Sequence, residues 1–118
     1  MSAPVASLSV IERLFPNIQQ GAKTHTIRWR EDVVGEGPLR FICDGAPDRR
    51  IDVEVTRVTN MPLSCAAAFI GLAEVWPDAV MLAGMREHYP AIRLDSVVQV
   101  IEFRLAADSD QGAKISEI

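Results

Sequence analysis

The chain reads Gly21-Ala22-Lys23-Thr24-His25-Thr26-Ile27-Arg28 at the point where an apolar, helix-like segment gives way to a strand. Gly21 stands where a glycine typically ends a helix. Thr24, Thr26 and Arg28 then alternate with other residues, and alternate residues of a strand point to the same side. This stretch therefore predicts two hydroxyls and a guanidinium on one side of a strand, just after a lysine. Such a set suits a small anionic or carbonyl-bearing ligand.

The strands are expected mostly in the first half of the chain. Four segments have the residue pattern of strands: residues 25–29, 39–43, 50–59 and 97–105. Turn residues at 44–48 join the second and third segments into a hairpin. The alternation breaks after Val55, which predicts a bulge or bend near Arg57. In the last segment the odd-numbered residues are expected to face one side.

Helices are expected on both sides of the hairpin. Apolar residues have helical spacing in three segments: residues 10–20, 62–73 and 79–87. Pro16 interrupts the first, which indicates either two short helical pieces or a helix that starts near the proline. Ser9 and Ser64 are the expected N-caps of the first two helices, and Pro77 marks the start of the third. The expected apolar face of the second helix is formed by Cys65, Ala68, Phe69 and Leu72. This order of elements indicates an α+β fold with a curved antiparallel sheet or an open barrel.

Composition limits the class of protein. The 118 residues suffice for one domain with a modest core, and 48% hydrophobic with 24% charged residues is typical of a soluble globular protein. No apolar run reaches the roughly 18 residues of a membrane span. The amino terminus has no basic region of a signal peptide. Cys43 and Cys65 are far apart and lack metal-ligand spacing, so we expect reduced thiols in a cytoplasmic protein that needs no metal or other cofactor.

The charge balance argues against a long nucleic-acid partner. The formal net charge is −4 and the pI is about 5.1, whereas proteins that bind duplex DNA usually carry a basic surface. We therefore expect no duplex DNA binding. A local basic pocket remains compatible with this balance, with Lys23, Arg28, Arg30 and Arg40 as its candidate cations.

The motif of the opening stretch resembles that of a known family. The pattern Ile18-x-x-Gly21-x-Lys23-Thr24-x-Thr26-x-Arg28 is similar to the signature of ASCH-domain proteins. The segments at 53–56, 88–90 and 100–103 agree with it, so that the resemblance covers about residues 8–105 and leaves 1–7 and 106–118 as flexible tails. It implies a PUA-like open β-barrel with covering helices. The short bacterial members, which include the N4-acetylcytidine amidohydrolase, look most similar.

The resemblance implies an activity and a set of site residues. The protein would hydrolyse the amide of a modified nucleoside, N4-acetylcytidine, to cytidine and acetate. The implied catalytic residues are Lys23 as base, Thr26 as nucleophile and Glu74 as a proton shuttle or orienting group. The implied substrate-binding residues are Thr24, Arg28, Trp29 and Trp76. A lysine works as a base only when its pKa falls well below the usual value of about 10.4.

The sequence also fits two other interpretations. The same residues would also suit a non-catalytic RNA-binding module that reads one unpaired nucleotide, or a small-ligand protein that has lost its chemistry. Trp29 and Trp76 suit base stacking and core packing alike. The expected partner is accordingly a modified nucleoside or single-stranded RNA.

Overall fold

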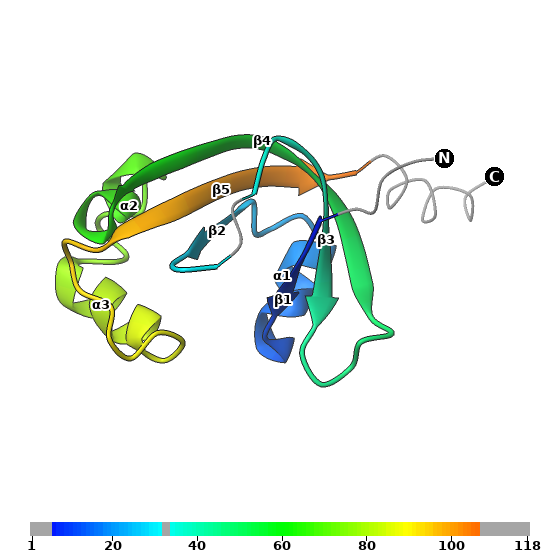
Figure 1. The fold of residues 1–118 in the computed structure, drawn as a ribbon, viewed down its shortest axis with the longest axis horizontal. Coiled ribbons are helices and arrows are strands. Elements are labelled where there is room, and N and C mark those ends of the chain that lie inside the picture. Colours follow the sequence, from blue (N-terminus) through cyan, green and yellow to red (C-terminus); the bar gives the residue numbers. More distant parts are fainter. Residues whose placement is uncertain (1–5, 32–33, 107–118) are drawn as a thin grey trace. The chain divides into compact units, whose positions relative to one another are not determined.

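The computed structural model describes residues 6–31 and 34–106, and its elements are those of an α+β protein (Figure 1). The strands are β1 (Ala6–Val10), β2 (His25–Arg28), β3 (Gly37–Cys43), β4 (Arg50–Pro62) and β5 (Val97–Leu105). The helical segments are η1 (Glu12–Leu14), α1 (Phe15–Gln19), α2 (Leu63–Phe69) and α3 (Asp78–Arg86). The strands form one hydrogen-bonded sheet in the order β1-β3-β4-β5-β2. Within the described ranges, no helix is long and apolar enough to cross a membrane.

The predicted hairpin is confirmed. β3 and β4 are antiparallel, with Leu39 opposite Val53, and the turn between them contains Gly45 at a φ of 81°, which favours glycine. Burial alternates along β4 until Val55, and Thr56 and Arg57 are then both exposed. The sequence therefore located the break in alternation correctly.

The amino-terminal segment differs from the prediction. Ala6–Val10 forms β1, which runs parallel to β3 with Leu8 opposite Phe41. Ser9 accordingly lies in a strand, and the helical stripe expected from residue 10 begins only at Glu12. From there the chain forms two short helical pieces, η1 and α1, which is one of the two predicted alternatives. Pro16 lies in the first turn of α1, where the missing N–H of proline costs nothing. The two-residue spacing of the buried Leu8 and Val10 is a strand pattern that competes with the helical one.

The helix α2 was predicted in the correct place with the wrong face. Its first residue follows β4 directly, and its N-cap is Pro62 instead of Ser64. The backbone N–H groups of Leu63 and Ser64 donate to the carbonyls of Ser96 and Leu94, and these bonds replace a side-chain cap. The buried residues of α2 are Leu63, Ala66 and Ala67, while Cys65, Ala68 and Phe69 are exposed. Because α2 follows β4 without a loop, the end of β4 determines which side of the helix is buried. The helix ends before Gly71, whose φ is 78°.

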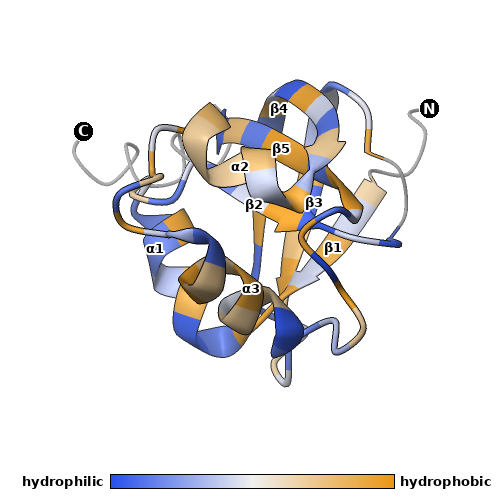
Figure 2. Cartoon of the chain, turned by 90° about the vertical axis from the view of Figure 1, so that its left-hand side faces the viewer, coloured by the Kyte–Doolittle hydropathy of each residue, from blue (hydrophilic) through white to orange (hydrophobic). Residues whose placement is uncertain are grey.

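The last two elements have the predicted bounds to within a residue. α3 starts after its N-cap Pro77, and β5 covers the predicted residues. The one-sided burial expected for β5 is wrong, however, because residues 98–101 are all buried and Val97 is 60% exposed. Figure 2 shows hydrophilic bands between hydrophobic ones along β5. The consecutive burial of Val98, Gln99, Val100 and Ile101 nevertheless indicates that this part of the strand is covered on both faces.

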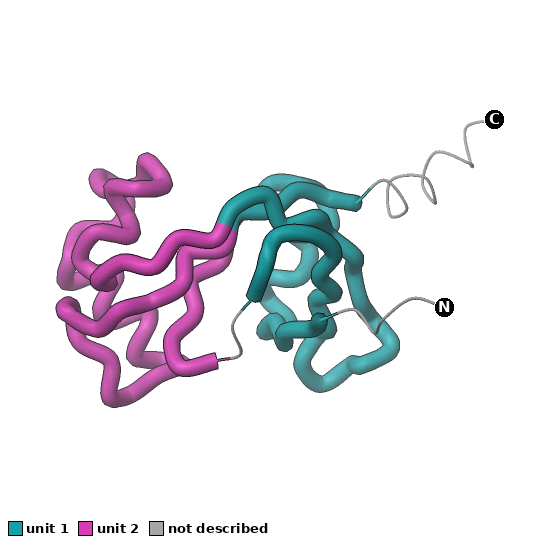
Figure 3. The backbone as a smooth tube through the Cα atoms, turned by 45° about the horizontal axis from the view of Figure 1, so that its top comes forward, with its two compact units in different colours: residues 1–24, 34–57, 102–118 teal, residues 25–33, 58–101 magenta. Residues whose placement is uncertain are grey.

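The chain divides into two compact units (Figure 3). Unit 1 consists of residues 1–24, 34–57 and 102–118, and unit 2 of residues 25–33 and 58–101. In the core of unit 1, the rings of Phe41 and Phe103 meet edge to face with centroids 5.0 Å apart. The buried core of unit 2 is formed by Leu63, Ala66, Ala67, Met81, Ile92, Val98 and Val100.

Candidate functional site

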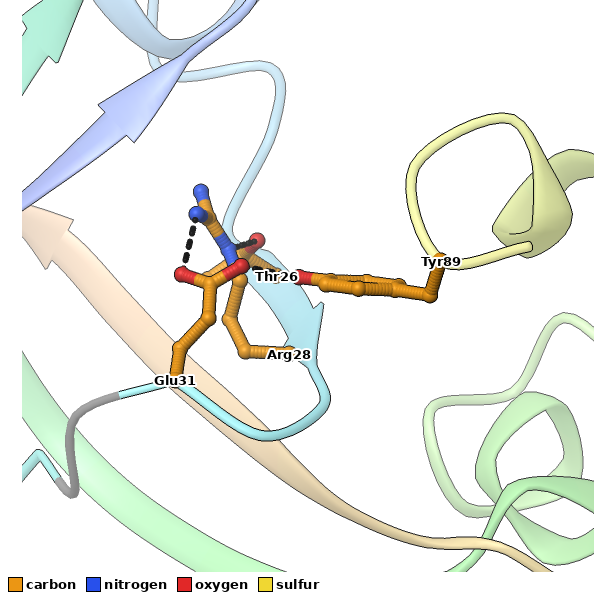
Figure 4. A network of polar contacts seen from close by, with 4 residues as sticks. All are labelled: Thr26, Arg28, Glu31 and Tyr89. Atoms are coloured by element: carbon orange, nitrogen blue, oxygen red, sulfur yellow. Dashed lines mark hydrogen bonds and ion pairs between the residues drawn. The ribbon is translucent and has the colours of Figure 1, made fainter. Parts of the chain in front are cut away.

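The centre of the candidate site is a threonine–arginine pair on β2, in unit 2 (Figure 4). Thr26 is 6% exposed. Its Oγ1 accepts a hydrogen bond of 2.9 Å from Nε of Arg28, two residues on. The bond confirms the prediction that both side chains point to the same side of this strand. Among the described residues, the buried polar side chains are Thr26 and Gln99, and both belong to unit 2.

Two residues outside the predicted site extend this pair. Nη1 of Arg28 donates to Oε1 of Glu31 at 3.1 Å, and the Tyr89 phenol donates to Oε2 of the same carboxylate. In Figure 4, Glu31 lies on the segment after β2, and Tyr89 reaches it from the segment after α3. We call these four side chains the Thr26–Arg28–Glu31–Tyr89 network. An opposite charge three residues from Arg28 was a sequence signal for Glu31, whereas no local signal pointed to Tyr89.

One residue of the network, Tyr89, has a shifted pKa. Burial raises the pKa of Tyr89 to about 12, and the hydrogen bond to the Glu31 carboxylate adds to this effect. Both causes disfavour the phenolate, because a buried anion loses solvation and would face a second negative charge. The phenol therefore stays protonated, and remains a hydrogen-bond donor, throughout the neutral pH range.

The two predicted aromatic residues lie in different surroundings within unit 2. The indole of Trp29 meets the Tyr89 ring edge to face with centroids 6.0 Å apart. The guanidinium of Arg30 lies 4.2 Å from the Trp29 ring centroid, and the backbone of Arg30 has a positive φ of 56°. Trp76 is half-buried, and its ring contacts that of His25 at 5.7 Å. One face of Trp29 is thus occupied by a cation–π contact.

Lys23 and Thr24 belong to unit 1, in the segment between α1 and β2. Gly21 has a φ of 79°, and its N–H donates to the carbonyl of Ile18. This is the helix-ending glycine that the sequence predicted. Lys23 is half-buried, and its backbone N–H donates to the Asn17 carbonyl at 3.0 Å. The roles of Lys23 and Thr24 in one cleft with Thr26 remain predictions.

Glu74, the third predicted catalytic residue, is exposed. It lies in the turn between α2 and α3, where the N–H groups of Val75 and Trp76 donate to the Leu72 carbonyl. Its role as proton shuttle also remains a prediction. Within residues 6–31 and 34–106, no three His, Cys, Asp or Glu side chains are placed to hold a metal ion.

Comparison with solved structures identifies the fold. An ASCH domain from Lactobacillus crispatus JV V101 matches with a TM-score of 0.57 and 15% identity, over 85% of this chain and 79% of that one. The fold is ASCH-like. A protein from Enterococcus faecalis V583 with the family model DUF984 matches with a TM-score of 0.59 and 13% identity, over 90% and 83% of the two chains. A hypothetical protein matches with a TM-score of 0.60 and 15% identity, over 87% and 100%.

These matches confirm the predicted α+β fold of the PUA-like, ASCH kind. No protein family model and no curated protein matches the chain. Because the identities to the solved structures are between 13% and 15%, the likeness establishes the fold alone.

Proposed function

We propose that this protein is an amidohydrolase that removes the acetyl group of N4-acetylcytidine, releasing cytidine and acetate. The resemblance of the motif between Gly21 and Arg28 to that of the short ASCH-domain amidohydrolases suggests this activity, and the ASCH-like fold is compatible with it. The observation that carries the proposal is the environment of the Thr26 hydroxyl.

The hydrogen bond from Arg28 prepares the Thr26 hydroxyl for attack on a carbonyl. Arginine donates only, so the threonine oxygen must be the acceptor of this 2.9 Å bond. The hydroxyl hydrogen is then directed away from Arg28 and is available to a base. A guanidinium next to the oxygen also stabilises the negative charge that develops there as the proton leaves. Burial strengthens this interaction, because little water screens the two groups.

The proposed reaction proceeds through an acetyl-enzyme. The Thr26 oxygen attacks the acetyl carbonyl carbon while its proton passes to the neutral amine of Lys23. The bond between the carbonyl carbon and N4 then breaks, and N4 takes the proton from Lys23. Water attacks the resulting ester, the ester C–O bond breaks, and the proton from water returns to the Thr26 oxygen by way of Lys23 or Glu74. The product leaves as acetic acid, which releases its remaining proton to solvent and becomes acetate, and every group of the protein returns to its initial state.

The half-buried Trp76 is the better candidate for stacking the cytosine ring, since one face of Trp29 is occupied by Arg30. Trp29 would then act from the edge of the binding site. An expected partner is the free nucleoside, in agreement with the net charge of −4. Retention of duplex DNA should be weak at physiological salt concentration.

The test is incubation of the purified protein with N4-acetylcytidine, with acetate release measured by chromatography. Lys23→Ala and Thr26→Ala should each reduce kcat at least about a thousandfold, and the double variant should be hardly slower, because residues that act as one unit are not additive. Thr24→Ala is the matched control, since it removes the neighbouring hydroxyl, and it should have a milder effect.

Two outcomes would contradict the proposal. A wild-type protein without deacetylation that binds single-stranded RNA with length-dependent affinity would favour the non-catalytic module. A Thr26→Ala protein with nearly full activity would exclude the hydroxyl as the nucleophile and favour direct attack by water.

A further inference from the structure

The Glu31 carboxylate connects two distant parts of the chain. One of its oxygens accepts from Nη1 of Arg28, three residues away, and the other accepts from the phenol of Tyr89, 58 residues away. The side chain of Arg28 is 11% exposed and that of Glu31 is 30% exposed. All participants belong to unit 2 (Figure 4).

We propose that Glu31, held by the Tyr89 phenol, is a positioning residue that fixes the Arg28 guanidinium and, through it, the Thr26 hydroxyl. This inference rests on the proposed function, because it assigns to Glu31 and Tyr89 the alignment of the nucleophile. It adds two residues that the motif between Gly21 and Arg28 does not contain.

The geometry of the guanidinium explains how such positioning works. The guanidinium is planar, and its N–H groups have fixed directions. A bond from Nε to Thr26 alone leaves the group free to rotate about that contact, whereas a second bond from Nη1 to Glu31 fixes its plane. The position of the Glu31 carboxylate then determines the direction of the Arg28 Nε–H. This direction in turn sets the orientation of the Thr26 hydroxyl.

Tyr89 in turn fixes the position of the Glu31 carboxylate. Glu31 lies on the short segment after β2, and its side chain has several rotatable bonds. The phenol of Tyr89 uses the second carboxylate oxygen and leaves the first one for Arg28. The Tyr89 ring packs edge to face against Trp29, so that it is a rigid donor.

The first test separates kcat from KM in the deacetylation assay. Tyr89→Phe keeps the ring and its packing but removes the donor. Glu31→Gln replaces one acceptor oxygen by an NH₂ group, which cannot accept from Arg28 or Tyr89. Each variant should lower kcat by about 10- to 100-fold and change KM less than about twofold. The reason is that the substitution disturbs the alignment of the Thr26 hydroxyl with the carbonyl and leaves substrate binding intact. The double variant should be no slower than the slower single variant.

Glu102→Gln is the matched control. It makes the same chemical change in a carboxylate that accepts from another arginine, Arg57, in unit 1. This variant should keep the kcat of the wild-type protein. An equal loss of kcat in Glu102→Gln, or an unchanged kcat in both Tyr89→Phe and Glu31→Gln, would overturn the inference.

A second measurement does not depend on catalysis. In the proton–nitrogen NMR spectrum, the Nε–H signal of Arg28, assigned by its loss in Arg28→Lys, reports the bond to Thr26. This signal should shift and exchange faster with water in Tyr89→Phe and in Glu31→Gln, and should be unchanged in Glu102→Gln. A signal that stays unchanged in both network variants overturns the positioning role.

The two measurements distinguish the failure of each proposal. An inactive wild-type protein whose Arg28 signal responds to Tyr89→Phe contradicts the proposed function and supports the Glu31–Tyr89 contact as the group that fixes Arg28. An active wild-type protein whose kcat is insensitive to both Tyr89→Phe and Glu31→Gln supports the proposed function and contradicts the inference. Because Tyr89→Phe preserves the ring, it serves on its own if Glu31→Gln does not fold.

Discussion

Arg40 and Asp52 in unit 1, and Arg28 and Glu31 in unit 2, form the same kind of ion pair in different surroundings. Arg40 binds Asp52 with two bonds of 2.7 and 3.1 Å across the β3–β4 hairpin, and the two side chains are 34% and 38% exposed. Arg28 is 11% exposed, and its partner carboxylate also accepts from Tyr89. Water can solvate both members of the first pair if it breaks, whereas in the second pair it reaches the Arg28 guanidinium poorly. The Arg40–Asp52 pair stabilises the register of β3 against β4. The Arg28–Glu31 pair holds the guanidinium that the proposed reaction uses.

The largest effect should follow removal of the carboxylate that pairs with the mostly buried Arg28. Glu31→Ala should lower the free energy of unfolding by about 3 kcal/mol, because it takes the countercharge from a guanidinium that is mostly removed from water. Urea denaturation followed by tryptophan fluorescence measures this loss. Glu102→Ala, which removes the carboxylate from the 56% exposed side chain of Arg57, is the control and should cost less than about 1 kcal/mol. Equal losses in the two variants would remove the distinction between the pairs.

The alkaline titration of Tyr89 should give the next largest effect. The pKa of about 12 in the folded protein lies above the value of about 10 in an unfolded chain. The contribution of Tyr89 to stability should therefore be complete below about pH 10 and be lost as the pH rises from about 10 to 12. Its size should be no more than about 2 kcal/mol, because the ring is only half-buried.

This titration can be observed directly. Tyr89 is the single tyrosine of the chain, so the ultraviolet absorbance of tyrosinate reports it alone. Glu31→Gln should lower the pKa of Tyr89 only partly, since burial is its largest cause and the carboxylate a smaller one. A wild-type tyrosine that ionises near pH 10 in the folded protein would contradict the described contact.

The smallest effect on stability should come from the Arg40–Asp52 pair, and it should disappear in acid. The hydrogen bond from Arg40 lowers the pKa of Asp52, so its stabilising effect is present above the unfolded value of about 3.9 and is lost as the pH falls through the folded value. Asp52→Asn should therefore be less stable than the wild-type protein by less than about 1 kcal/mol at neutral pH, and the gap should close below about pH 4. Urea denaturation at a series of pH values measures this gap. A gap that widens in acid would show that another group is responsible.

The two pairs also differ in how far they were predictable. The hairpin from residue 39 to 59 followed from alternation and from a turn signal, and it places Arg40 opposite Asp52. The Thr26–Arg28 contact followed from the same two-residue period. Local patterns were misleading in β1, where the apolar residues fit both a strand and a helix. They were also misleading for the buried face of α2, because that face depends on the direction of the preceding strand.

The sequence by itself determined the α+β class, the positions of β2 to β5 and of α3, and the orientation of Thr26 and Arg28, because these depend on contacts between residues that are close along the chain or joined by a short turn. Only the tertiary structure decided that Tyr89 meets Glu31, 58 residues away. It also decided that β1 pairs with β3, and which side of α2 is buried. These features depend on which surfaces remain to be covered once the sheet has formed, and no local periodicity records that information.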